Sequence, residues 1–243
     1  MNIDCITNII TIVASLGTFG AAIVAYLTLV EIKKQRIESQ KPQILFNNVT
    51  RGFIDFNVIP DKVPISWTGS NEKLKNHVLF EMINAGKDIA KNFQSGYKLD
   101  INSFIELIKK NDPQNDINIS YDPDWLRFSS NNNRIDKQVF ISVNKGFVSK
   151  LEYLLTRSIQ EKPSGFSVPE EYLILNSCLL YLSVKYNFSI YTDQIPKIYM
   201  ETTYQDISGR EKYIYQTIET FYFKEGEFHF SLKSISKKEY YAA

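Results

Sequence analysis

The pattern of apolar and charged positions divides the chain into one long uncharged run and a mixed region of about 200 residues. From Cys5 to Val30, about 26 residues, there is no charged side chain. A helix of that length reaches about 39 Å, which exceeds the roughly 30 Å of hydrocarbon in a bilayer. A core helix of a soluble protein this long would show a polar face to water. The run therefore predicts a transmembrane helix.

The sequence around the run predicts that the helix is retained as an anchor, with the body in the cytoplasm. A signal peptide has a basic start and a small-residue cleavage site, whereas Met1–Asp4 carries one acid and no base. The basic side chains Lys33, Lys34 and Arg36 follow the run directly. By the positive-inside rule the N-terminus then lies outside and the body inside. The lipid bilayer is the first predicted partner.

Small side chains recur along the run with a 4-3-4-3 spacing. Small residues let helix backbones approach closely in lipid, where no hydrophobic force drives association. We therefore expect a homo-oligomer that packs through this seam, although such residues are common in any membrane span. The predicted packing residues are Ala14, Gly17, Thr18, Ala21, Ala25 and Thr28.

The helix is expected to continue past the membrane to about Gln40, because Pro42 disfavours helix before it. This divides the chain into a helical segment, residues 1–41, and a body, residues 42–243. Cys178 is the only cysteine of the body, so no internal disulfide is expected.

The body reads as an α+β domain, a β-sandwich-like fold with inserted helices at about 103–186. The loops at 110–118 and 128–137 are rich in Asn, Asp and Ser and are expected to be mobile. Helices are expected at 103–108, 149–160 and 170–186, the last with Pro169 at its first position. Alternating or apolar runs predict strands at 43–49, 52–59, 77–83, 198–204, 213–223 and 228–232.

Two tight turns separate these strands. Asn84-Ala85-Gly86 ends one strand, and the loop Asp206–Arg210 joins the predicted hairpin near the C-terminus. Asp206 is expected to accept hydrogen bonds from backbone amides of its loop, with a ligand-binding role as the alternative. Gly209 is expected to adopt a positive φ.

The stretch VLFEMINAGKDIAKNF, Val78 to Phe93, resembles the N-x-G element of immunoglobulin-like sandwich domains. With the N-terminal span and the Y-x-D-x-x-G hairpin, the layout resembles a loose set of bacterial single-pass membrane proteins. Some relatives by layout serve as membrane effectors in anti-phage systems. The resemblance implies an immunoglobulin-like cytosolic domain at a bacterial inner membrane.

The residues offer little that indicates catalysis. A net charge of +1 does not indicate a nucleic-acid partner. His77 and His229 fall in predicted strands, away from any cluster that could bind a metal. Cys178 lies among leucines, where a thiol acts as a small hydrophobic side chain. We therefore predict no catalytic, cofactor-binding or metal-binding residue and no cofactor, and expect a non-enzymatic protein.

The segment Tyr121–Trp125 is the part of the body whose side chains are best suited to binding a ligand or a partner. Asp122, Asp124 and Trp125 combine carboxylates with an aromatic ring, which could bind a ligand or a partner. The favoured alternative is a structural turn in which Trp125 and Leu126 dock onto the core.

Taken together, these features predict a membrane-anchored, non-enzymatic sensor or effector that binds a cytosolic protein partner or ligand and acts through its membrane helix. One alternative is a constitutive adaptor that tethers a partner at the membrane. Another is an enzyme with an unrecognised site.

Overall fold

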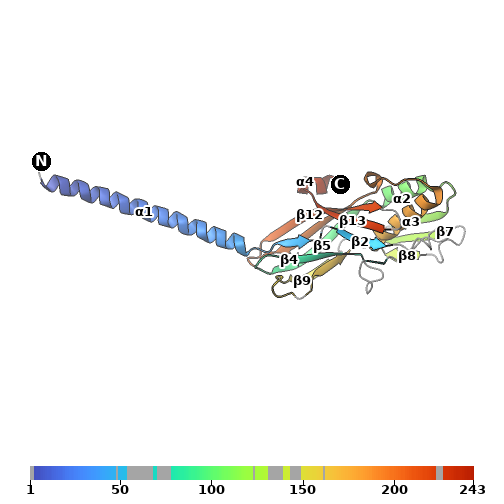
Figure 1. The fold of residues 1–243 in the computed structure, drawn as a ribbon, viewed down its shortest axis with the longest axis horizontal. Coiled ribbons are helices and arrows are strands. Elements are labelled where there is room, and N and C mark those ends of the chain that lie inside the picture. Colours follow the sequence, from blue (N-terminus) through green and yellow to red (C-terminus); the bar gives the residue numbers. More distant parts are fainter. Residues whose placement is uncertain are drawn as a thin grey trace.

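The computed structural model describes residues 3–47, 49–53, 68–69, 78–122, 124–130, 139–142, 149–160, 162–222 and 227–243. One long helix, α1 (Ile3–Gln40), projects from an elongated body that is rich in β-strands (Figure 1). The protein is therefore α+β, with an apolar N-terminal helix.

Helix α1 has no tertiary cover where its side chains are described. Residues 15–40 are exposed, and large apolar side chains such as Leu16 (65% exposed) and Phe19 (66%) face outward all along it. Within this range the helix is long and apolar enough to cross a membrane. It ends at Gln40, as predicted from Pro42, which is buried against the body.

The largest sheet is antiparallel and seven-stranded. Its central hairpin, β11–β12, is the one predicted from sequence, and Ile198, Met200 and Tyr204 alternate inward along its first strand. The sheet order is β3 (Thr68–Gly69), β2 (Val49–Phe53), β13 (Glu227–Ser234), β12 (Glu211–Tyr222), β11 (Ile198–Gln205), β5 (Ala90–Leu99) and β9 (Ser149–Leu154).

Two three-stranded sheets complete the β-structure. The first lies at the α1 end, and its order is β1 (Ile44–Phe46), β4 (Leu79–Asn84) and β10 (Ser164–Ser167). The second lies at the far end (Figure 1), and its order is β6 (Ile117–Asp122), β7 (Trp125–Ser130) and β8 (Val139–Ser142).

The helices of the body lie mostly at the end away from α1 (Figure 1). Helix α2 (Ile101–Lys110) begins two residues before the predicted start at 103, and it is capped by Asp100, whose carboxylate accepts from the Ser103 amide at 3.0 Å. Helix α3 (Glu170–Tyr186) follows Pro169, which is its N-cap rather than its first residue. The remaining elements are η1 (Thr192–Gln194) and α4 (Lys237–Ala242).

The core has two apolar clusters. The larger surrounds α3, where the Tyr172 ring packs against Phe104 and Phe230 and its hydroxyl accepts from Thr220 at 2.9 Å. The smaller lies near α1 and joins the β1–β4–β10 sheet to the seven-stranded sheet through Met82 on β4 and Phe93 on β5. Burial of these side chains is the main favourable contribution to folding.

Several expectations about the middle of the chain were wrong. The segment 149–160 is not a helix, because Leu151 and Leu154 pair with β5 and the chain then turns. The segment 110–118 is not a plain loop, since the buried Asp112 carboxylate accepts from the amides of Asp116 and Ile117. Strands β6 to β10 lie between α2 and α3, so the region 103–186 is not mainly helical. Residues 54–67, His77 and residues 131–138 lie outside the described residues.

Candidate functional site

The joint between α1 and the body is built around the side chain of Asn84. This side chain is fully buried at the end of β4. Its Oδ1 accepts from the backbone amides of Gln43 (3.1 Å) and Gly86 (3.0 Å). Its Nδ2 donates to the carbonyls of Asp88 (2.7 Å) and Leu154 (3.3 Å). One amide thus connects the α1 exit, the β4–β5 turn and the end of β9.

Backbone contacts reinforce this joint. The Asp88 amide donates to the Gln40 carbonyl at 2.9 Å, and the Ala85 amide donates to the Gln43 carbonyl at 2.8 Å. A Cβ at Gly86 would lie 2.6 Å from the Gln43 nitrogen and closer still to the Lys41 carbonyl oxygen. Glycine is required here because the two backbone segments approach too closely for any side chain.

The joint is continuous with the sheets below it. Ile44 pairs with Asn84 in the β1–β4 ladder, directly after the α1 exit. The Arg157 amide donates to the Asn84 carbonyl at 2.9 Å, and Asn84 also forms a β-bridge with Thr156. Only three residues, Lys41 to Gln43, lie between the end of α1 and β1, and Pro42 among them is buried. Because Gln40 and Gln43 on either side of it are hydrogen-bonded to the body, no flexible linker separates α1 from the body.

The β11–β12 turn lies beside the joint, and the prediction for it is confirmed. The Asp206 carboxylate accepts from the amides of Ser208 (2.9 Å) and Arg210 (3.0 Å), and Gly209 has φ +79°. Burial alone would raise the pKa of Asp206, but the Ser208 and Arg210 donors outweigh it and hold this pKa below its usual value.

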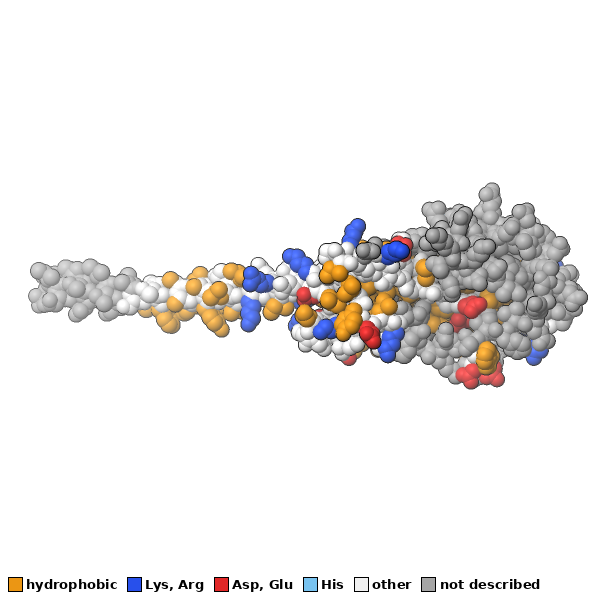
Figure 2. Space-filling model, turned by 90° about the horizontal axis from the view of Figure 1, so that it is seen from below, with side chains coloured by type: hydrophobic (Ala, Val, Ile, Leu, Met, Phe, Trp, Pro, Cys, Tyr) orange, Lys and Arg blue, Asp and Glu red, His pale blue; other side chains and the backbone are white. Residues whose placement is uncertain are grey.

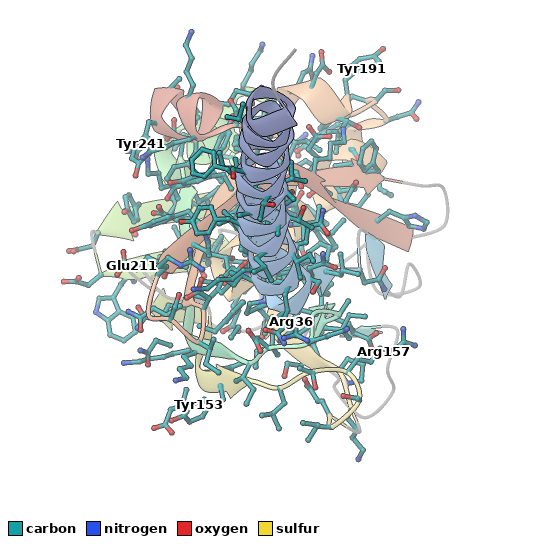
Figure 3. The ribbon with its side chains drawn as sticks, turned by 90° about the vertical axis from the view of Figure 1, so that its left-hand side faces the viewer. Arg36, Tyr153, Arg157, Tyr191, Glu211 and Tyr241 are labelled. Atoms are coloured by element: carbon teal, nitrogen blue, oxygen red, sulfur yellow. The ribbon has the colours of Figure 1, made fainter. Side chains whose placement is uncertain are left out.

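A hollow of about 460 Å³ separates the end of α1 from this turn. Ile37 and Lys41 line it on the side of α1, and Ile207 and Arg210 line it on the side of the turn. Figure 3 views the body from the α1 side, with Arg36 at the base of the helix. The hollow is open to solvent beside the helix exit.

The predicted ligand residues Asp122 and Trp125 come together at the opposite end, where they pair across the β6–β7 hairpin. With Ser120, Tyr121 and Arg127 they line a second hollow of about 680 Å³. Trp125 is 49% exposed, so the expectation that it docks onto the core was wrong. Its neighbour Leu126 is buried because alternate residues of a strand point to opposite faces. Asp124 lies exposed in the turn.

The predicted membrane residues all lie on α1. The side chains of Thr18, Ala21, Ala25 and Thr28 are exposed, and the Thr28 hydroxyl donates to the Val24 carbonyl of its own helix. Gly17 has no described atom within 4 Å of a Cβ position, and the side chain of Ala14 lies outside the described residues. The basic side chains Lys33, Lys34 and Arg36 are exposed beyond the apolar run.

Cys178 and Glu219 lie in the body away from both hollows, and each has structural contacts. Cys178 is fully buried, and burial, with a smaller contribution from Asp112, raises the pKa of its thiol, as expected for a hydrophobic role. Glu219 is bound by Lys197 and Lys233. Among the described residues, no group of three or more His, Cys, Asp or Glu side chains could hold a metal ion.

No family model, no curated protein and no solved structure matches this chain.

The sequence indicated the Asp206 turn and the candidate residues Asp122 and Trp125, but it did not indicate the joint between α1 and the body. The Asn84 turn was visible as a turn, whereas its partners Gln43 and Leu154 lie 41 and 70 residues away in the chain. The tripeptide Asn84-Ala85-Gly86 after an apolar run was the one signal available.

Proposed function

We propose that this protein is a membrane-anchored, non-enzymatic sensor or effector whose body acts on its membrane helix through the joint. In this proposal α1 spans a bacterial inner membrane with the N-terminus outside. The body, which we propose to be an immunoglobulin-like sandwich, lies in the cytoplasm. The observation that carries the proposal is the Asn84 joint. Because no flexible linker lies between the body and α1, a partner that moves the body would also move α1.

The exposed surface of α1 supports the anchoring part of the proposal. Large apolar side chains are exposed along it, and keeping apolar surface in water costs about 25 cal/mol per Å² relative to an apolar environment. Lipid removes this cost. The bases that follow, Lys33, Lys34 and Arg36, would lie at the anionic headgroups of the cytoplasmic leaflet.

The hairpin at the far end supports a site for a cytosolic protein partner. Trp, Tyr and Arg side chains dominate the binding energy of protein interfaces. Trp125, Tyr121 and Arg127 line one hollow there, at the end of the body remote from α1. A partner bound at this position would act on the joint with the body as a lever. The resemblance in layout to anti-phage membrane effectors adds phage defence as the proposed setting.

We propose that association of the helices through the seam on α1 changes the permeability of the membrane, and we call this change the output. A single span without charged side chains cannot pass ions alone, so any change in membrane permeability needs an assembly of helices. Replacing Ala21 and Ala25 with Leu would hold the helices apart and keep the span apolar. A matched control, Ile23→Leu with Val30→Leu, adds leucines on the opposite side of the helix.

The test is expression of the full chain in bacteria, with resistance of the protein to alkaline extraction as the measure of anchoring. Cross-linking in membranes reports assembly, and growth with dye leakage reports output. We expect the seam variant to lose assembly and output together, while the control keeps both. Unchanged output with a disrupted seam would contradict an effector and favour the constitutive adaptor. Complete release at alkaline pH would contradict anchoring.

A further inference from the structure

A row of apolar side chains crosses the outer face of the small sheet beside the joint. Leu45 on β1 lies opposite Ile83 on β4 in the strand register. The bridge between Asn84 and Thr156 places the preceding residue, Leu155, beside Ile83. Because Asn84 and Thr156 are buried, these three neighbours point away from the core. Leu45 is 52% exposed and Leu155 is 36% exposed.

Two further side chains extend this row. Tyr153 lies two residues before Leu155 and is 57% exposed, and Ile159 in the following turn is 62% exposed. Figure 2 shows apolar side chains gathered on the body next to the end of α1. We call Leu45, Ile83, Tyr153, Leu155 and Ile159 the joint face. A continuous exposed apolar patch of this kind marks an interaction site.

The bilayer is not the natural occupant of the joint face. Ten residues of α1, Glu31 to Gln40, separate the end of the uncharged run from the body. They are about 15 Å long, at 1.5 Å per residue. The polar layer on one side of a bilayer is about 5–8 Å thick. Even at a tilt of about 40° these residues rise about 11 Å above the hydrocarbon, so α1 holds the joint face clear of the lipid.

We propose that the joint face binds the joint face of a second copy of this chain. The inference rests on the proposed anchoring of α1. Because the joint has no flexible linker, two copies in one membrane present this face at the same height above it. A two-fold axis along the membrane normal can then bring the faces together, each side contributing the same residues.

The charges at the rim fit such a self-complementary contact. An interface of this kind needs both signs of charge on one surface. Glu81 and Glu152 are exposed beside the apolar row, and so is Arg157. The patch is small for a stable interface in solution. Two chains held side by side in one membrane nevertheless meet at a high effective concentration, so weak contacts suffice.

Single cysteines in the full-length protein test the proposal in native membranes. Cys5→Ser removes the cysteine at the membrane edge, and Cys178 stays because it is fully buried. Ile159→Cys and Leu45→Cys then place one thiol on the joint face. Tyr191→Cys is the control, since Tyr191 is equally exposed at 62% and points to the opposite side of the body from Tyr153 and Arg157 (Figure 3).

A short bifunctional maleimide should give dimers for Leu45→Cys and Ile159→Cys at several times the Tyr191→Cys yield. Adding Ile159→Asp to Leu45→Cys should reduce the dimer to the control level, and this turn position tolerates a polar residue without affecting the core. Equal yields at all three positions would overturn the proposal. So would joint-face thiols that are shielded from a soluble maleimide yet never cross-link, because a lipid or another protein would then cover them. Alkaline extraction of the same samples reports anchoring separately.

Discussion

Replacing Asn84 with alanine should weaken the protein far more than the loss of an ordinary polar side chain. The substitution removes four hydrogen bonds from a fully buried side chain and leaves two amides and two carbonyls without that partner. Each such bond contributes about 1 kcal/mol net. The expected loss is therefore about 3–4 kcal/mol, out of a total stability of about 5–15 kcal/mol.

The assay is thermal unfolding of the full chain in detergent micelles, followed by near-ultraviolet circular dichroism, which reads the aromatic-rich body rather than α1. For a body of this size each kcal/mol lowers Tm by about 2–4 °C, so Asn84→Ala should lower Tm by about 6–16 °C. The matched control is Asn111→Ala, which removes one hydrogen bond, to the Leu107 carbonyl at 2.8 Å. Its Tm should fall by about 2–4 °C.

A local readout separates loosening of the joint from general instability. Lys87 lies exposed in the β4–β5 turn, within the joint. Trypsin should cleave after Lys87 much faster in Asn84→Ala than in Asn111→Ala at a temperature where both remain folded. Melting of Asn84→Ala within about 2 °C of the wild type, with unchanged cleavage at Lys87, would refute the account of the joint.

Three further predictions concern other parts of the chain. Gly209→Val should destabilise by about 1 kcal/mol or more, read as a lower Tm, because φ +79° strains a β-branched residue; an unchanged Tm would contradict this. Because the folded state lowers the pKa of Asp206, its contribution to stability is present above the unfolded pKa of about 3.9 and is lost as the pH falls through the folded value. Asp206→Asn should therefore flatten the acid limb of the Tm-against-pH curve below about pH 4, and an unaltered limb would argue against the assignment. In intact cells, Tyr191→Cys with Cys5→Ser should resist a membrane-impermeant thiol reagent, whereas labelling before lysis would reverse the proposed orientation.

Local chemistry made some elements of the fold predictable from sequence. Hairpin β11–β12 has an alternating pattern and an Asp-x-x-Gly turn, and both its strands and its turn bonds are confirmed. Helix α3 has acids in its first turn and an apolar run of helical length. Segment 149–160 has a short apolar run whose spacing fits helix and strand alike, and pairing with β5 decides in favour of strand.

The candidate sites were predictable only where they are local. Asp122 and Trp125 are three residues apart, so their meeting across a hairpin needs no knowledge of the fold. The exposure of Trp125 depends on which face of β7 the core covers, and that choice is made by Leu126 and Phe128. The joint face joins Leu45, Ile83 and Leu155 from three parts of the chain. Such a surface has no signature in the sequence.

The stiff exit of α1 has a consequence for how the protein would respond to its membrane. The uncharged run is about 39 Å long as a helix, whereas the hydrocarbon is about 30 Å thick, so burying the whole run needs a tilt of roughly 40°. A thicker bilayer would let α1 stand more upright and a thinner one would lay it down further. With no hinge at Gln40, the body would lean by the same angle. The β6–β7 hairpin at the far end of the body would then change its height above the membrane as the bilayer thickness changes.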